Sequence, residues 1–122
     1  MVRQRFEPEL NKREAYIKPW DIDEIARQVD EQSSRMLWYL WGHRHAKLDE
    51  LKVISGETSH MKVLTRIKEV INPAARHLLG KPIMVFERSA LDYYTGEHIL
   101  YSWWLNEEAT SGHVKLATQE FG

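Results

Sequence analysis

The sequence predicts an α+β fold in which an antiparallel β-sheet packs against one long N-terminal helix and a short second helix. Three observations support this prediction. Apolar residues recur at helical spacing over about 21–41, a proline and a glycine bracket a short helix at 72–80, and strand-like runs flank a turn within 83–106. With 122 residues and 43% hydrophobic content, we expect a single domain over 1–122, with its sheet-forming region at about 51–121.

The long helix is predicted over residues 21–41. Asp21 and Glu24 have the spacing of a capping box, in which the two side chains satisfy free backbone N–H groups at a helix start. Gly42 is expected to end the helix, because glycine enters the left-handed conformation without steric cost. The apolar positions that define the helix are Ile22, Ile25, Ala26, Val29, Met36, Leu37 and Leu40.

The segment between the two predicted helices is harder to assign. Residues 51–54, LKVI, are expected to form a short strand. Residues 61–71, MKVLTRIKEVI, alternate apolar and charged side chains and are rich in β-branched residues, which favours a strand. The same segment also fits a helix through Leu64, Ile67 and Ile71, so both interpretations stay open.

A short helix and a β-hairpin are predicted next. Asn72 is expected to cap the helix ahead of Pro73, and Gly80 to close it. The hairpin strands IMVFERSAL and HILYSWWLN flank a loop from Asp92 to Gly96. An even-numbered loop puts one set of side chains on a common face: Met84, Phe86, Arg88, Ala90, Ile99, Tyr101, Trp103 and Leu105. Residues 113–121, HVKLATQEF, are expected to add a further strand.

Composition limits the classes of function. The 17 basic and 18 acidic residues nearly cancel, so a nucleic-acid partner is not expected. No stretch reaches membrane-spanning length and the N-terminus lacks a secretory apolar region, so we expect an unprocessed cytoplasmic protein without a membrane partner. The chain has no cysteine and no phosphate-binding glycine loop, and His43 and His45 have no third ligand beside them, so no metal or cofactor is expected.

Arg88 is the leading candidate for ligand binding. The predicted face places its guanidinium among Phe86, Tyr101 and Trp103, where burial without a partner is expensive. A carboxylate or phosphate would match the forked N–H donors, and the aromatic rings would form the walls of a pocket. We therefore expect these four residues to bind a small anionic or aromatic molecule. Alternatively, Arg88 stacks on Trp103 or pairs with a carboxylate of the long helix.

An aromatic cluster near the end of the long helix supports a second hypothesis. Trp38, Tyr39 and Trp41 are more than one apolar stripe can bury. They either pack on the sheet as ordinary core or leave a patch that another subunit covers, and the second interpretation predicts a homo-oligomer such as a homodimer.

Residues 61–106 carry a resemblance to a known family. The segment MKVLTRIKEVI, the helix NPAARHLLG with its leucine-glycine end, the strand PIMVFERSALD and the returning strand HILYSWW resemble the C-terminal half of the UTRA ligand-sensing domain, of the chorismate-lyase-like fold. The resemblance implies an antiparallel α+β domain that binds a small, often anionic, effector, with Arg88 at the arginine of the E-R pair. The first 60 residues show no winged-helix pattern, so a transcription regulator is not expected.

The sequence thus leads to three hypotheses. The first is a non-catalytic domain that binds a small anionic or aromatic effector. The second is a homo-oligomeric interaction or structural module. The third is a chorismate-lyase-like enzyme, for which the resemblance implies a second arginine and a carboxylate; Arg66, Arg76 and Glu87 are available.

Overall fold

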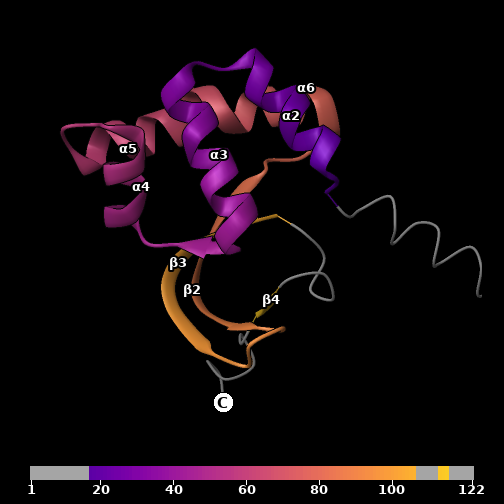
Figure 1. Ribbon diagram of the computed structural model, residues 1–122, viewed down its shortest axis with the longest axis vertical. Coiled ribbons are helices and arrows are strands. Elements are labelled where there is room, and N and C mark those ends of the chain that lie inside the picture. The colour runs from indigo at the N-terminus through magenta and orange to yellow at the C-terminus, as the bar shows by residue number, and fades with distance from the viewer. Residues whose placement is uncertain (1–16, 107–112, 116–122) are drawn as a thin grey trace, which may run out of the picture.

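The protein is an α+β structure with an antiparallel sheet, as the sequence predicts. The computed structural model describes residues 17–106 and 113–115. Its helices are α2 (Pro19–Gln28), α3 (Glu31–His43), α4 (Leu48–Ser55), α5 (His60–Arg66), the π-helix η1 (Ile67–Ile71) and α6 (Asn72–Leu79). Its strands are β1 (His45–Ala46), β2 (Met84–Asp92), β3 (His98–Leu105) and β4 (His113–Lys115). The helices gather in one layer, from which the β2–β3 hairpin extends and curls (Figure 1).

The predicted long helix is in fact two helices. The chain is extended at Val29 and Asp30, with ψ values of 172° and 170°, and Asp30 accepts a hydrogen bond of 3.4 Å from the Ser33 amide at the start of α3. Asp30 is therefore the N-cap of α3. Asp21 is not the N-cap of α2 but its third helical residue; Lys18 is the N-cap, and Asp21 accepts a 2.9 Å hydrogen bond from the Lys18 amide in a capping box.

The end of α3 also differs from the prediction. Gly42 lies inside the helix, which continues to His43. The terminating residue is Arg44, with φ of 72°, and its amide donates to the Leu40 carbonyl at 2.8 Å. A residue other than glycine rarely adopts positive φ. The helix therefore ends in a strained conformation that the sequence does not announce.

The strand predictions for residues 51–54 and 61–71 are wrong, because both segments are helical, and the helical alternative for 61–71 is correct. Val63, Ile67 and Ile71 are fully buried at intervals of four residues, which forms one helical stripe against the core. The π-helix η1 joins α5 to α6 as one continuous helical segment, so Asn72 is not an N-cap. Gly80 ends this segment with φ of 80°, as predicted.

The hairpin has the predicted register. Met84 pairs with Leu105, Phe86 with Trp103, and Ala90 with Ile99. The predicted common face holds only at the base of the hairpin. Nearer the tip, Ala90 and Ile99 are buried against Trp104, which belongs to the opposite predicted face.

The change of face coincides with Tyr101 in β3. Its φ is 50°, so the regular alternation of side chains along β3 is interrupted there and the hairpin bends. β1 pairs with β3 at Trp103 and Trp104, β4 pairs with β2 at residues 90–92, and the sheet order is β1-β3-β2-β4. The predicted strand over 113–121 is seen at His113–Lys115, and residues 116–121 lie outside the described chain.

The main core lies between the helices and the base of the hairpin. It combines apolar residues of all the helices with three residues of β2 and β3: Met84, Trp103 and Leu105. A buried asparagine fixes this junction, because the Asn72 side chain accepts hydrogen bonds from the amides of Ile83 and Met84 and donates to the Met84 carbonyl, at 2.9–3.1 Å. Among the described residues, no helix has both the length and the apolar character needed to cross a membrane.

Candidate functional sites

The four residues predicted to bind a ligand lie together on the hairpin but are not enclosed. Phe86 and Tyr101 are 46% and 57% exposed, and Arg88 is exposed as well. Trp103 is buried against the helical layer. The expectation that Arg88 lies in an apolar environment is therefore wrong. Ala90 and Ile99 are buried in a cluster with Trp104, away from the exposed Arg88.

Phe86, Arg88 and Tyr101 form what we call the outer face of the hairpin. The rings of Phe86 and Tyr101 are stacked with centroids 6.5 Å apart and planes 29° apart, and Phe86 also contacts the buried Trp103 ring at 5.4 Å. Arg88 lies directly across from Tyr101, because its neighbours pair with Ser102 and Leu100 on either side of that tyrosine. Arg88 forms no ion pair with any residue in the described ranges. The outer face therefore combines two exposed aromatic rings with an exposed guanidinium.

A buried carboxylate anchors the hairpin tip to the end of α3. The Asp92 side chain is 1% exposed and lies 3.0–3.2 Å from the Nε and Nη2 atoms of Arg44. Asp92 also accepts hydrogen bonds from the amides of Tyr94 and Thr95, at 3.0 and 3.3 Å. The Arg44 guanidinium lies over the Tyr94 ring, 5.3 Å from its centroid. The contact between Arg44 and Asp92 joins residues that are 48 positions apart in the chain.

Charge and burial shift two pKa values at this anchor. Burial alone would raise the pKa of Asp92, but the hydrogen bonds from Arg44 and the two amides outweigh burial and lower the pKa below 3.8. His45 lies 3.9 Å from Asp92, and its ring is 5.0 Å from that of Trp104. Burial lowers the pKa of His45 below 6.5, although the nearby carboxylates oppose this shift. His45 is therefore harder to protonate than a histidine in water.

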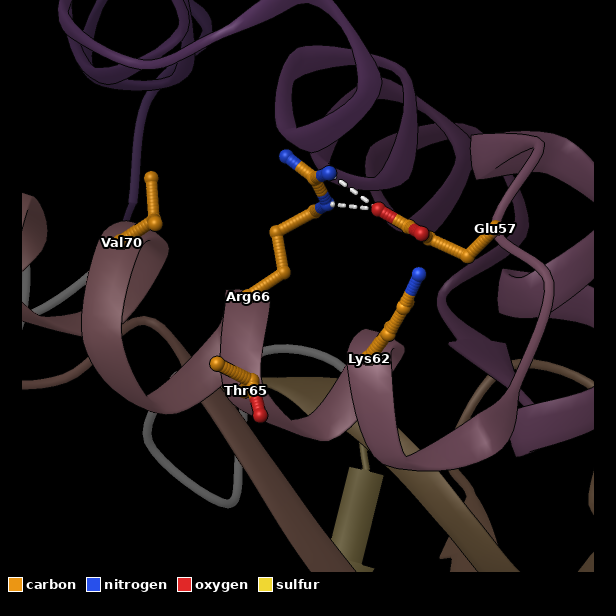
Figure 2. A pocket seen from close by; sticks show the side chains of 5 residues that line it. All are labelled: Glu57, Lys62, Thr65, Arg66 and Val70. Carbon is orange, nitrogen blue, oxygen red and sulfur yellow. Dashed lines mark hydrogen bonds and ion pairs between the residues drawn. The ribbon is translucent and has the colours of Figure 1, made fainter.

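A second arginine-centred network lies in the helical layer, beside an open pocket of about 360 Å³ (Figure 2). The pocket is lined by Glu57, Lys62, Thr65, Arg66 and Val70. Figure 2 shows the Arg66 guanidinium turned toward Glu57, and this arginine also pairs with Asp30 and donates to the Ser33 hydroxyl at 3.3 Å.

The guanidinium of Arg66 is fully engaged by the two carboxylates of this network. Burial alone would lower the pKa of Arg66, but hydrogen bonds to Glu57 and Asp30 raise it. Burial alone would raise the pKa of Asp30, yet its contacts with Ser33 and Arg66 lower it below 3.8. Two carboxylates already neutralise the guanidinium, so Arg66 ties α3, α5 and the end of α4 together. It is poorly placed to supply the second arginine of a chorismate-lyase-like site.

The predicted aromatic cluster on α3 divides between the core and the surface. Tyr39 and Trp41 pack partly against the main core, whereas Trp38 is 39% exposed. Trp38 and Tyr39 line a shallow depression of about 500 Å³ with Ile54 of α4. Tyr39 and Trp41 fit the interpretation as ordinary core, and coverage of the exposed Trp38 by another subunit stays a prediction.

The histidines serve separate contacts. His43 stacks on Tyr39 with ring centroids 4.0 Å apart, while His45 lies against Trp104. His98 lies 2.8 Å from the Ser89 hydroxyl, an exposed pair that sequence spacing does not reveal. Within residues 17–106 and 113–115, no three metal-ligating side chains come together.

No protein-family model matches this chain, and neither a curated protein nor a solved structure gives a match. Its function must therefore be argued from the chemistry of its own side chains.

Proposed function

We propose that the protein is a non-catalytic binding domain whose hairpin outer face binds a planar anionic molecule. The observation that supports this most directly is the exposure of two neighbouring aromatic rings, Phe86 and Tyr101, beside the exposed guanidinium of Arg88. Aromatic groups prefer offset stacking on one another, and a guanidinium pairs with carboxylate through two parallel N–H donors. An aromatic carboxylate satisfies both preferences at once.

The open shape of the face limits the affinity. A ligand on an open surface loses less contact with water than one in an enclosed pocket, so little apolar area is buried on binding. We therefore expect a dissociation constant on the order of 0.1–1 mM for a single-ring carboxylate such as benzoate, which corresponds to about 4–5.5 kcal/mol. A larger natural ligand that covers both rings binds more tightly.

Benzoate, salicylate and naphthalene-2-carboxylate titrations test this function, with benzamide and naphthalene as uncharged references. Binding is followed by chemical-shift changes of the hairpin amides and of the indole N–H of Trp103, whose ring contacts Phe86. We expect Phe86→Ala and Tyr101→Ala to weaken both classes of ligand. Arg88→Gln should weaken only the carboxylates, because it removes the charge and leaves the rings in place.

Arg76→Gln is the matched control, since Arg76 is an exposed arginine on α6. If carboxylates bind equally well to the wild type and to Arg88→Gln, the role of Arg88 is wrong. If none of these carboxylates shifts a hairpin amide at 10 mM, binding of planar anions at this face is ruled out.

A homo-oligomeric interaction module is the second candidate. It is favoured by Leu100, a further large apolar side chain of β3, which is next to Tyr101 in the chain and is 46% exposed. Exposed apolar patches commonly mark protein interfaces. This candidate predicts that light scattering detects a dimer, and that Phe86→Glu or Leu100→Glu dissociates it if the contact is through the hairpin. If the contact is through α3, Trp38→Glu dissociates the dimer instead. A monomer at 0.5 mM wild-type protein rules it out.

A further inference from the structure

The curl of the hairpin depends on a residue of the outer face itself. Tyr101 has φ of 50°, a conformation that bulky residues adopt only when their surroundings enforce it. The bend at Tyr101 brings Ala90 and Ile99 into the cluster with Trp104, and it leaves the Tyr101 ring outside beside Phe86. With ordinary extended backbone at residue 101, Ala90 and Ile99 would share a face with Phe86, as simple alternation requires.

The bend is closed into a ring by contacts at both ends. At one end, His45 and Ala46 of β1 pair with Trp104 and Trp103 of β3. At the other end, the buried Asp92 at the hairpin tip returns to Arg44, the residue that immediately precedes β1. The hairpin is therefore attached at its base, where Trp103 and Trp104 pair with β1, and at its tip, where Asp92 binds Arg44. Because Arg44 and β1 are adjacent in the chain, the hairpin must bend for both contacts to form.

Arg44 is itself strained. Its φ of 72° turns the chain sharply from α3 into β1, at the residue whose side chain holds Asp92. Strained residues persist where the surrounding contacts over-determine them. Both non-glycine residues with positive φ in the described ranges, Arg44 and Tyr101, thus lie on this one ring of contacts.

We infer that Arg44 and Asp92 are positioning residues for the outer face, because their ion pair holds the hairpin in the bent form that stacks Tyr101 on Phe86. This inference rests on the proposed binding function of that face. When the pair is lost, Tyr101 relaxes toward extended backbone, its ring leaves Phe86, and the aromatic surface is dismantled although neither Arg44 nor Asp92 belongs to it.

The experiment compares Arg44→Gln and Asp92→Asn with the wild type by solution NMR of the full chain. Backbone chemical shifts of Tyr101 report its φ, and ring-to-ring NOEs report its contact with Phe86. We expect both variants to keep the helical signals, to move the Tyr101 shifts toward extended values and to weaken the NOEs. If the bent form falls to one tenth of the population, the benzoate affinity falls about tenfold.

Arg35→Gln is the control, because it removes an exposed ion pair with Glu31 on the same helix as the anchor. Arg44→Lys keeps one charge contact and should give intermediate Tyr101 shifts; it also keeps the test decisive should the glutamine variant fail to fold. Wild-type Tyr101 shifts and NOEs in Arg44→Lys and Asp92→Asn overturn the inference. Because these readouts need no ligand, a failure of the carboxylates to bind the wild type refutes the proposed function alone.

Discussion

Two arginine–carboxylate centres stabilise this molecule in different ways. In the helical layer, Arg66 joins Asp30 and Glu57, and its own backbone is ordinary helix with φ of −64°. At the hairpin, Arg44 holds Asp92 from a backbone with φ of 72°. The first centre fastens elements that are already relaxed, whereas the second keeps strained backbone in place. The same ion-pair chemistry therefore stabilises one region and constrains the other.

The difference sets how much each centre contributes to stability. Removing Arg66 leaves two carboxylates without their counterion and releases no strain. Removing Arg44 leaves one buried carboxylate, which still has two backbone amides as donors. The helical centre should therefore be the more sensitive of the two to loss of its arginine.

The largest effect is expected for Arg66→Met. Breaking a buried ion pair by removing one partner costs about 3 kcal/mol when the remaining charge stays desolvated. The Glu57 side chain is 11% exposed, so water replaces the guanidinium poorly. Urea unfolding at pH 7 measures the loss, and Arg76→Met on α6 should change stability by less than about 0.5 kcal/mol. Equal stabilities of the two variants would contradict the role given to Arg66.

A smaller loss of stability is expected at Arg44, and two substitutions there separate the ion pair from the backbone strain. Arg44→Met removes the partner of Asp92 and keeps the unfavourable φ, at about 2 kcal/mol. Arg44→Gly removes the same partner but adopts positive φ freely, so it should be less destabilising by about 1 kcal/mol. Urea unfolding of both variants gives the comparison. A glycine variant that is less stable than the methionine variant shows that the backbone of residue 44 is unstrained.

Tyr101 offers a test in which the usual strand preference reverses. Valine normally favours strands over asparagine, but asparagine tolerates positive φ and valine does not. Tyr101→Asn should therefore be more stable than Tyr101→Val, by about 1 kcal/mol. At the neighbouring exposed Leu100, the same two substitutions should show the ordinary order, with valine the more stable. Thermal unfolding of the four variants measures both orders of stability. If valine is the more stable substitution at both positions, Tyr101 is not held in the positive-φ conformation.

The smallest effect is the pH dependence of the hairpin centre. The lowered pKa of His45 means that the folded protein binds this proton less readily than the unfolded chain does. The stability that neutral His45 contributes is complete above pH 6.5, the pKa of this histidine in the unfolded chain. This stability is lost as the pH falls from there through the lower pKa of His45 in the folded protein. The pKa values of Asp30 and Asp92 are lowered from 3.8, so their contributions are lost only in stronger acid.

Unfolding by urea between pH 7.5 and 5 isolates the histidine. We expect His45→Gln to show a weaker loss of stability over this range than the wild type does, whereas His77→Gln, at an exposed position on α6, should follow the wild type. If the stability of the wild type and that of His45→Gln fall in parallel over this range, His45 does not cause the pH dependence of the hairpin centre.

The sequence predicted the features that depend on neighbouring residues. The register of the hairpin follows from its loop, and Gly80 and Gly96 have the positive φ, 80° and 76°, that their positions require. The break between α2 and α3 was missed because the apolar spacing continues across it, although Asp30 and Ser33 carry a capping signal. Residues 61–71 fit both periods, and only burial in the core decides for the helix.

The candidate site was harder to predict because it depends on contacts between distant residues. Phe86, Arg88 and Tyr101 were identified from alternation along the hairpin, but their exposure was not. Exposure follows from the bend, and a tyrosine with positive φ leaves no local trace in the sequence. The partner of Asp92 lies 48 residues away, a separation at which side-chain spacing carries no information.

The buried amide of Asn72 has a consequence for the order of folding. It binds the backbone of Ile83 and Met84, only 11 and 12 residues further along the chain, whereas the Arg44–Asp92 contact must close a loop about four times as long. Short loops close at lower entropic cost and form sooner. We therefore expect the root of the hairpin to dock on α6 early, and its tip to reach α3 as one of the last steps toward the native state.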